Sequence, residues 1–291
     1  MTLTDSSPDE SDLPPWVVLH VPHDSTLVPD AVRDQFLLSD AELQHELLRM
    51  TDHLTHALFA APPCAAAVVR APVSRLVVDV ERFEDDASEP MAERGMGAVY
   101  STTSALTPLR RPLAEGEREA LLRDWYRPHH ACLEAAVAEA LAAHGRCLVI
   151  DCHSFPSEAL PYERAEPSER RPDVCIGTDA FHTPEWLAES FLAAFDDASW
   201  PVARDTPFSG AIVPASRYRQ DARVAAVMVE IRRGLYLDEA AGTPLPGFEA
   251  VARRVREACI DAVDRAVQEG VLAGGAPALP SQDVRASTAR E

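Results

Sequence analysis

The chain alternates short apolar runs, rich in β-branched residues, with longer stretches in which apolar positions recur every three or four residues. The short runs predict buried strands, and the longer stretches predict amphipathic helices. Strands that alternate with helices are typical of an α/β sheet covered on both faces. We therefore predict a single α/β domain with a mixed, mostly parallel sheet and helices on both faces. The predicted strands cover residues 16–19, 66–69, 76–80, 147–150, 174–176, 202–204 and 225–229.

The helical pattern is clearest near the start of the chain. Residues 40–59 carry a continuous apolar stripe, and Ser39 and Glu42 predict a capping box at the start of this helix. Long segments rich in Pro, Ser and charge predict loops, which in a compact domain usually serve function. The other predicted helices cover residues 115–143, 184–195 and 248–271, and the long loops cover 84–112 and 154–172.

The two ends of the chain do not follow this pattern. Residues 1–14 and 274–291 are rich in Pro, Ser and Ala, so we predict disordered tails around one domain at residues 15–273. No apolar run reaches the roughly 18 residues of a membrane span. The acidic start of the chain does not resemble a secretory leader. We therefore expect a cytoplasmic protein that does not bind membranes.

The charged residues of the chain exclude some classes of binding partner and reaction. The formal net charge is −20, and all 27 basic residues are Arg. Nucleic acid binding rests on clustered basic residues, so we expect none. A chain without Lys has no side-chain amine for Schiff-base chemistry. The six cysteines show no CxxC pair and are expected to be reduced core residues. We expect a small-molecule substrate, and the oligomeric state is not predicted.

Polar side chains collect at the ends of several predicted strands. Ligands of open α/β sheets bind beyond the carboxyl ends of the strands. Two imidazoles and one carboxylate can hold a catalytic zinc ion with one position open, and a further carboxylate can accept a proton from water. The segments HVPHDS, IDCHS and VMVEIRR bring such groups to three strand ends. We assign the imidazoles to His23 and His153, and the proton-accepting role to Glu230.

Neighbouring residues are expected to support these groups. A metal-bound His usually donates its other N–H to a carboxylate or a carbonyl, and Asp151 is expected to orient a ligand in this way and not to be a ligand itself. His20, three residues before His23, is either a ligand in its place or a supporting residue. Cys152 points away from His153 along a strand and is expected in the core. The histidines on predicted helices and loops are expected at the surface: His129, His130, His144 and His182.

A family resemblance rests on longer motifs. The chain carries, in this order, HVPHDSTLVP, VSRLVVDVERFEDD, IDCHS, PFSGAIVP and VMVEIRRGLYLDE. Together, over roughly residues 16–240, they resemble the N-formylglutamate amidohydrolase family, which is similar in architecture to zinc carboxypeptidases and zinc-dependent peptidoglycan amidases. The resemblance implies a phosphorylase/hydrolase-like, zinc-exopeptidase-like fold. It also implies hydrolysis of the amide bond of a small N-acyl amino acid, with N-formyl-L-glutamate as the leading substrate. The implied cofactor is one Zn²⁺ per chain, or another divalent ion.

The third metal ligand follows only from this resemblance. The family carries a TD motif on the first long helix, and this chain reads MTDHLTHALF there, so Asp52 is the match. On a continuous helix, Asp52 would lie roughly opposite the apolar stripe, where a surface acid is expected. Asp24, next to His23, is the alternative ligand.

Arginines are expected to bind the carboxylates of the substrate, because guanidinium groups bind carboxylates through two parallel hydrogen bonds. The family motif resembles D-x-N-R, and this chain reads DVER at residues 79–82, which implies that Arg82 binds the substrate. The PFSG turn at residues 207–210 contains a Gly that lets backbone approach a ligand. The other predicted substrate contacts are Arg75, Arg217, Ser209 and Gly210.

Two other functions are compatible with these residues. Glu81 replaces the Asn of the family motif and adds negative charge, which leaves open another N-acyl amino acid or a short peptide as the substrate. The farther alternative is a non-catalytic anion-binding protein with the same fold. Such a protein would need no metal and would tolerate Glu230→Gln.

Overall fold

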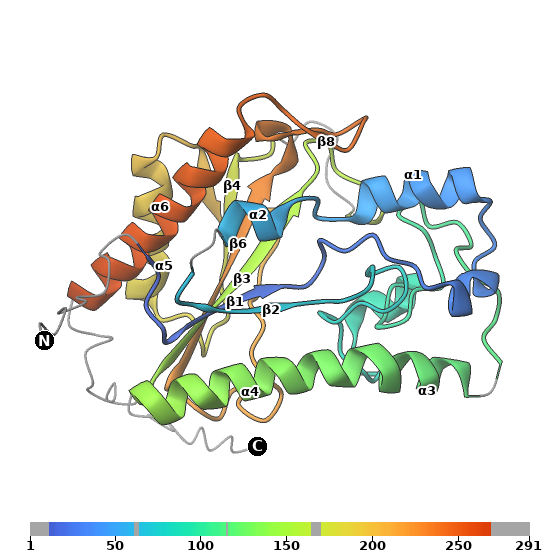
Figure 1. The fold of residues 1–291 in the computed structure, drawn as a ribbon, viewed down its shortest axis with the longest axis horizontal. Helices are drawn as coiled ribbons and strands as arrows, with labels where there is room; N and C mark the ends of the chain where they lie inside the picture. Colours follow the sequence, from blue (N-terminus) through green and yellow to red (C-terminus); the bar gives the residue numbers. More distant parts are fainter. Residues whose placement is uncertain (1–11, 61–63, 115, 164–169, 269–291) are drawn as a thin grey trace, which may run out of the picture.

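The computed structural model describes residues 12–60, 64–114, 116–163 and 170–268 (Figure 1). Of the two predicted tails, only residues 12–14 belong to this part of the chain, and Leu13 is buried there. The predicted tail at 274–291 lies outside the described residues. Among the described helices, none combines the length and the apolar character needed to cross a membrane.

A six-stranded sheet forms the centre of the molecule, in the order β2-β1-β3-β6-β4-β5. Strands β2, β1, β3 and β6 are parallel, and β4 pairs antiparallel with β6 and parallel with β5. The predicted α/β class with a mixed, mostly parallel sheet is therefore confirmed. The strands are β1 (Val17–Val21), β2 (Ala67–Arg70), β3 (Cys147–Phe155), β4 (Val174–Gly177), β5 (Val202–Arg204) and β6 (Val224–Arg232), with a separate pair β7 (Leu237–Asp238) and β8 (Thr243–Pro244).

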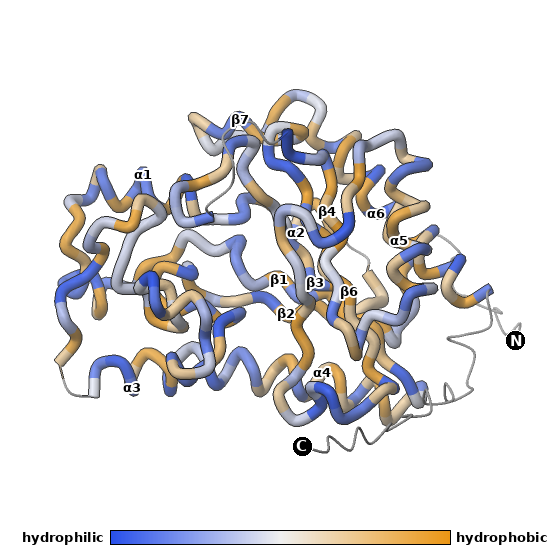
Figure 2. Tube along the Cα trace, turned by 180° about the vertical axis from the view of Figure 1, so that it is seen from behind, coloured by the Kyte–Doolittle hydropathy of each residue, from blue (hydrophilic) through white to orange (hydrophobic). Residues whose placement is uncertain are grey.

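Helices cover both faces of this sheet (Figure 1). The helices α2 (Thr55–Phe59), α5 (Glu185–Asp197) and α6 (Phe248–Gln268) pack on one face, and α4 (Arg127–His144) packs on the other. Hydrophobic and hydrophilic positions alternate along α5 and α6 in Figure 2, as expected for helices that bury one side. Cys152 is fully buried in the cluster beneath α5 and α6, so its predicted core position is confirmed.

A further apolar cluster lies between α1 (Asp40–Met50), α3 (Glu117–Leu121) and the loops that connect them to the sheet. In Figure 1, α1 and α3 lie to the right of the central sheet, and α5 and α6 lie to its left. This arrangement places the long predicted loop at 84–112 beside the carboxyl ends of the parallel strands. The short helical turns are η1 (Asp30–Gln35), η2 (Pro90–Arg94), η3 (Leu122–Tyr126), η4 (Pro161–Glu163) and η5 (Arg233–Leu235).

The predicted strand at residues 76–80 is wrong, because this segment consists of turns and irregular backbone. The N–H of Val77 donates to the carbonyl of Ser74 at 2.8 Å, and the N–H of Glu81 donates to Asp79 Oδ1 at 2.9 Å. Short polar side chains that bind nearby backbone groups compete with the ladder of a sheet. The apolar residues of the segment are buried in the cluster near α1 instead.

The predicted helix at residues 40–59 is divided into two. The capping box of Ser39 and Glu42 is present, but α1 ends at Met50 and α2 begins only at Thr55. Leu54 adopts a left-handed conformation with φ of 65° between them. Asp52 therefore lies in the break and not on a helix face, so the expectation of a surface position does not apply to it.

The histidines expected at the surface divide into two kinds. His144 is exposed and His130 is half-buried, but His129 and His182 are buried, at 3% and 1% exposure. His182 Nδ1 donates to the carbonyl of Val224 at 2.7 Å, and its Nε2 accepts from the N–H of Arg219 at 2.8 Å. One side chain thus satisfies two backbone groups in the interior. The cysteines also divide, since four are buried, Cys64 is half-buried and Cys132 is exposed.

Replacing His182 by Ala should lower the free energy of unfolding by roughly 2–4 kcal/mol, because two buried backbone groups lose their partner. The exposed His144→Ala is the matched control and should change stability by less than about 0.5 kcal/mol. Urea unfolding followed by circular dichroism measures both. Equal effects of the two substitutions would contradict a structural role for His182.

Candidate metal centre

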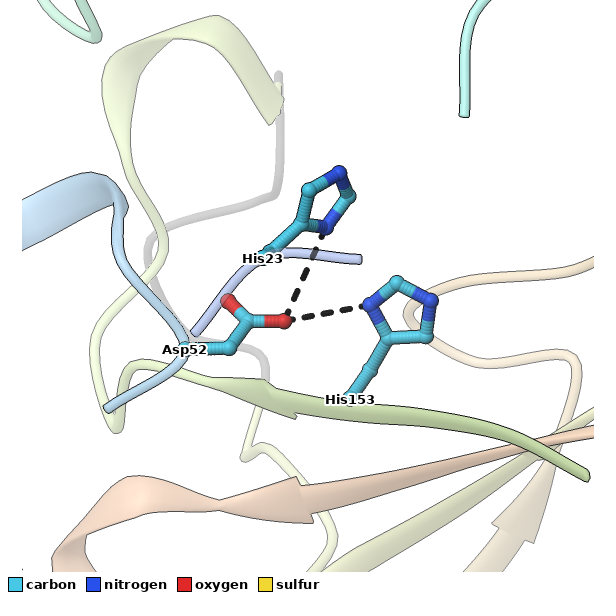
Figure 3. Close-up of side chains that lie close together, drawn as sticks. All are labelled: His23, Asp52 and His153. Atoms are coloured by element: carbon cyan, nitrogen blue, oxygen red, sulfur yellow. Dashed lines mark hydrogen bonds and ion pairs between the residues drawn. The ribbon is translucent and has the colours of Figure 1, made fainter. Parts of the chain in front are cut away.

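Three side chains from separate parts of the chain meet at the edge of the sheet (Figure 3). They are His23, just after β1, Asp52 in the break between α1 and α2, and His153 on β3. His153 Nδ1 lies 3.1 Å from Asp52 Oδ2, and His23 Nδ1 lies 3.8 Å from the same oxygen. All three residues are buried. The three ligands predicted from the sequence thus turn one donor atom each toward a common point.

The outer ring nitrogen of each imidazole is held by a carboxylate. His23 Nε2 donates to Asp79 Oδ1 at 2.9 Å, and His153 Nε2 donates to Asp151 Oδ1 at 3.1 Å. A hydrogen bond at Nε2 keeps the proton there and leaves the Nδ1 lone pair available to a metal ion. His23 Nδ1 is buried and has no hydrogen-bond partner among the described residues. This buried nitrogen, aimed at a carboxylate oxygen, fits the role of a metal ligand.

Asp52 is oriented from its other side by Arg233. Arg233 Nη2 donates to Asp52 Oδ1 at 2.8 Å, while its Nε donates to Ser154 Oγ at 3.2 Å. Burial alone would raise the pKa of Asp52, but the close contacts with His153 and His23 and the charge of Arg233 hold it well below its usual value. Asp52 is therefore held as a carboxylate, the form that binds a metal ion.

Glu230 lies beside His153 in the sheet, since the register of β3 and β6 pairs these two residues. Its Oε2 is buried and has no hydrogen-bond partner within the described part of the chain. Burial raises the pKa of Glu230 to about 8, against the opposing charges of His153 and Arg233. Arg232, two residues after Glu230 on the same strand, donates to Asp173. The carboxyl group is thus free to exchange protons with a ligand.

His20 does not join the first three residues but lies behind them. His20 Nδ1 donates to Asp151 Oδ1 at 2.8 Å and lies 3.4 Å from Glu81 Oε1, and its Nε2 is 2.8 Å from His129 Nε2. Burial would lower the pKa of His20, but Asp151 and Glu81 raise it to about 9. Burial and the neighbouring His20 lower the pKa of His129 to about 3. His20 therefore carries the proton of this pair and supports the site from behind.

A cavity of about 1300 Å³ opens over these groups. Four of the predicted substrate contacts lie in its wall, namely Arg75, Arg82, Ser209 and Gly210. Arg75 Nη2 donates to Asp79 Oδ2 at 2.9 Å, and Tyr100 donates to the same oxygen. Arg82 Nε is buried without a hydrogen-bond partner among the described residues. Arg82 thus has donor capacity left for a ligand.

Two candidates from the sequence lie elsewhere. Arg217 is not in the wall of the cavity and pairs with Asp221 at 3.1 Å and Glu134 at 3.4 Å. The structure therefore does not bring Arg217 to the site, because the turn that carries it directs it toward α4. Asp24, the alternative ligand, accepts from Arg70 Nε at 2.6 Å and is likewise not in the ligand group.

Sequence reasoning did not single out Asp79 as a support for His23, Arg233 as the partner of Asp52, or His129 as the partner of His20. Arg233 directly follows Arg232, and nothing in the sequence tells two adjacent arginines apart. Asp79 had a usable signal, because a single acid between Val78 and Val80 interrupts an apolar run. A buried acid at such a position needs a partner.

Comparison with known proteins adds a family and a fold. The sequence model of the family described as N-formylglutamate amidohydrolase matches residues 16–237. A protein of Pseudomonas putida named N-formylglutamate deformylase is 26% identical over 231 residues, which are 77% of this chain and 82% of that protein.

Two crystal structures are similar to this chain. One is an N-formylglutamate amidohydrolase from Ralstonia eutropha JMP134, with a TM-score of 0.75 and 24% identity over 88% of this chain and 95% of that one. The other is a gene product of Agrobacterium tumefaciens, with a TM-score of 0.54 and 22% identity over 89% of this chain and 90% of that one. At these identities the two structures support the fold alone.

The substitution Glu230→Gln should stabilise the chelator-treated protein more at pH 8 than at pH 5. With its pKa raised from 4.5 to about 8, Glu230 binds a proton in the folded state that the unfolded chain releases. The wild-type protein therefore loses stability as the pH rises through this range, whereas the Gln variant does not. We expect the gap between their unfolding free energies, from urea titrations, to widen by about 1–4 kcal/mol. A gap that stays constant would contradict the raised pKa.

Proposed function

The chain belongs to the N-formylglutamate amidohydrolase family, and we propose that it is a zinc-dependent hydrolase that converts N-formyl-L-glutamate and water to formate and L-glutamate. One observation carries the proposal. His23 Nδ1, Asp52 Oδ2 and His153 Nδ1 converge beside the buried carboxyl group of Glu230. The name of the related Pseudomonas putida protein, a deformylase of N-formylglutamate, supports the choice of substrate.

The donor set suits zinc. Two imidazoles and one carboxylate are a common ligand set of catalytic zinc sites, in which one position remains open. His23, Asp52 and His153 would hold the ion. When bound, zinc supplies a Lewis acid that lowers the pKa of water and stabilises negative charge on the carbonyl oxygen. Other divalent ions bind the same types of donor.

Glu230 moves the protons of the reaction. It accepts a proton from the water that attacks the formyl carbon and then delivers that proton to the amide nitrogen. The C–N bond breaks, and formate and the amine of glutamate are released. An unpaired, buried carboxylate is a stronger base than an exposed one, which supports this assignment.

The arginines of the cavity suit a substrate with two carboxylates. Arg82 has no side-chain hydrogen bond in the described part of the chain, and its Nε lies 3.7 Å from Asp79 Oδ2. A substrate carboxylate would accept two parallel hydrogen bonds from its guanidinium group. Arg75 adds positive charge nearby. Gly210 has φ of 101° and open space where a Cβ would lie, which lets the backbone of Ser209 and Gly210 approach the substrate.

A second candidate is hydrolysis of an amino acid that carries a larger acyl group. The cavity of about 1300 Å³ exceeds the needs of N-formylglutamate, and part of its wall is apolar, with Phe155, Phe208 and Met228. Assays with N-acylglutamates of increasing acyl size separate the two candidates. A kcat/KM that rises with acyl size would favour the second, and one that falls would favour the formyl substrate.

The proposed function is tested by zinc content and turnover together. Elemental analysis of untagged wild-type protein should give about one zinc ion per chain, and His153→Ala should lose it while the exposed His144→Ala keeps it. Glu230→Gln should keep the zinc but lower kcat for formate release by about 10²- to 10⁴-fold. Wild-type protein that binds no zinc after incubation with the ion would refute the proposal. Full activity of Glu230→Gln would refute the role of that residue.

The substitution Arg82→Ala should raise KM for N-formyl-L-glutamate by roughly 10- to 100-fold, since a charge-assisted hydrogen-bond pair is lost. Arg217→Ala is the matched control, because Arg217 itself is not in the wall of the cavity and is paired with Glu134 and Asp221. Its KM should remain within about twofold of the wild-type value. Steady-state assays of formate release measure both KM values. Equal KM values for the two variants would contradict the binding of a substrate carboxylate by Arg82.

A further inference from the structure

The side chain of Glu81 has no part in the proposed reaction, although it lines the same cavity. Its Oε2 lies 3.2 Å from His153 Nε2, and its Oε1 lies 3.4 Å from His20 Nδ1. Among the described residues, these two imidazoles are the ion-pair partners of Glu81, and no arginine is within pairing distance. The carboxylate is thus turned toward the imidazoles and not toward the arginines that suit a substrate.

His153 therefore faces two carboxylates with one ring nitrogen. Its Nε2 lies 3.1 Å from Asp151 Oδ1 and 3.2 Å from Glu81 Oε2. On the other side, His20 Nδ1 faces the same two side chains at 2.8 Å and 3.4 Å. Asp151 thus accepts a hydrogen bond from each of the two imidazoles, and Glu81 is an ion-pair partner of both.

Backbone contacts fix Glu81 in this place. Its N–H donates to Asp79 Oδ1 at 2.9 Å, and the same oxygen accepts from His23 Nε2 at 2.9 Å. Asp79 thus holds His23, and Glu81, the next acid along the chain, contacts His153. A hydrogen bond donated by the outer N–H to a carboxylate orients a metal-bound His and increases its basicity. A second carboxylate at that nitrogen strengthens both effects.

We propose that Glu81 is a positioning residue that holds His153 together with Asp151, strengthens zinc binding and does not contact the substrate. This inference rests on the proposed function, because it places zinc at His153 Nδ1. It also gives a role to Glu81, whose negative charge distinguishes DVER from the D-x-N-R motif of the family. The charge is balanced by imidazoles inside the protein, so the arginines remain available to an anionic substrate.

The test is the zinc affinity of Glu81→Gln in the full chain, measured by competition with a chelator of known affinity. The substitution keeps the size of the side chain and removes its charge. We expect zinc to bind roughly 10- to 100-fold more weakly. At saturating zinc, KM for N-formyl-L-glutamate should remain within about twofold of the wild-type value, because the substrate does not meet residue 81.

Glu84→Gln is the matched control. It removes one acid from the same segment, and Glu84 pairs with the half-exposed Arg127 and not with an imidazole. Its zinc affinity should equal that of the wild-type protein. A loss as large as that of Glu81→Gln would overturn the proposal, since it would show a general effect of charge.

The other outcomes are distinguishable. Wild-type protein without zinc would refute the proposed function, whereas unchanged affinity in Glu81→Gln with normal wild-type binding would refute only this inference. A lower KM with unchanged affinity would show that Glu81 faces the substrate. Two zinc ions in the wild type and one in Glu81→Gln would show that His20, Glu81 and Asp151 are themselves a ligand set, which also overturns it.

A measurement on the unaltered protein makes the test independent of how the variant folds. In zinc-loaded wild-type protein with ¹⁵N-labelled histidine, the Nε2 proton of His153 should resonate far downfield and exchange slowly, as expected between two carboxylates. A resonance typical of a solvent-exposed imidazole would overturn the proposal.

Discussion

The pairing of β3 with β6 is the constraint on which the site depends. These two central strands run parallel over nine residue pairs, from Cys147 with Val224 to Phe155 with Arg232. The register sets His153 beside Glu230, so the imidazole and the carboxyl group that we propose moves protons share one face of the sheet. A slip of one residue would turn one of them into the core beneath α5 and α6. Because both faces are buried, such a slip is strongly disfavoured.

The site concentrates charge in a place where charge is costly. Asp52, Asp79 and Asp151 are almost fully buried, and each accepts hydrogen bonds from an imidazole or a guanidinium group. Pairing of this kind offsets desolvation, but it makes the loss of one partner expensive, since the other charge is then left alone. Glu230 differs from these acids, because one of its oxygens has no partner within the described residues. A buried carboxyl oxygen without a partner lowers the stability of the fold, and such a loss of stability is common at functional sites.

The sequence alone was sufficient for the fold class and for the idea of a metal site, because strand-end motifs such as IDCHS are short and local. It placed His153 after a strand at residues 147–150, whereas β3 continues to Phe155 and carries the residue within it. It could not place Asp52, since the break at Leu54 depends on tertiary contacts that no periodicity reveals. The sequence likewise could not predict that the side chain of Arg217 turns away from the cavity, because a residue in a turn can point either into a cavity or away from it. His129 and His182 were misjudged for a related reason. Burial of a polar side chain is decided by partners distant in the chain.

The backbone contact between Asp52 and His23 has a consequence for how an ion is received. The N–H of Asp52 donates to the carbonyl of His23 at 2.9 Å, so the segments that carry these two proposed ligands are joined through their main chains. The spacing of the donors is therefore set while the chain folds, and little ordering remains for the moment of binding. Because of this preorganisation, the arrangement of the proposed ligands forms, and is lost, together with the local fold. Loosening of the segment between α1 and α2 would release both ligands in a single step.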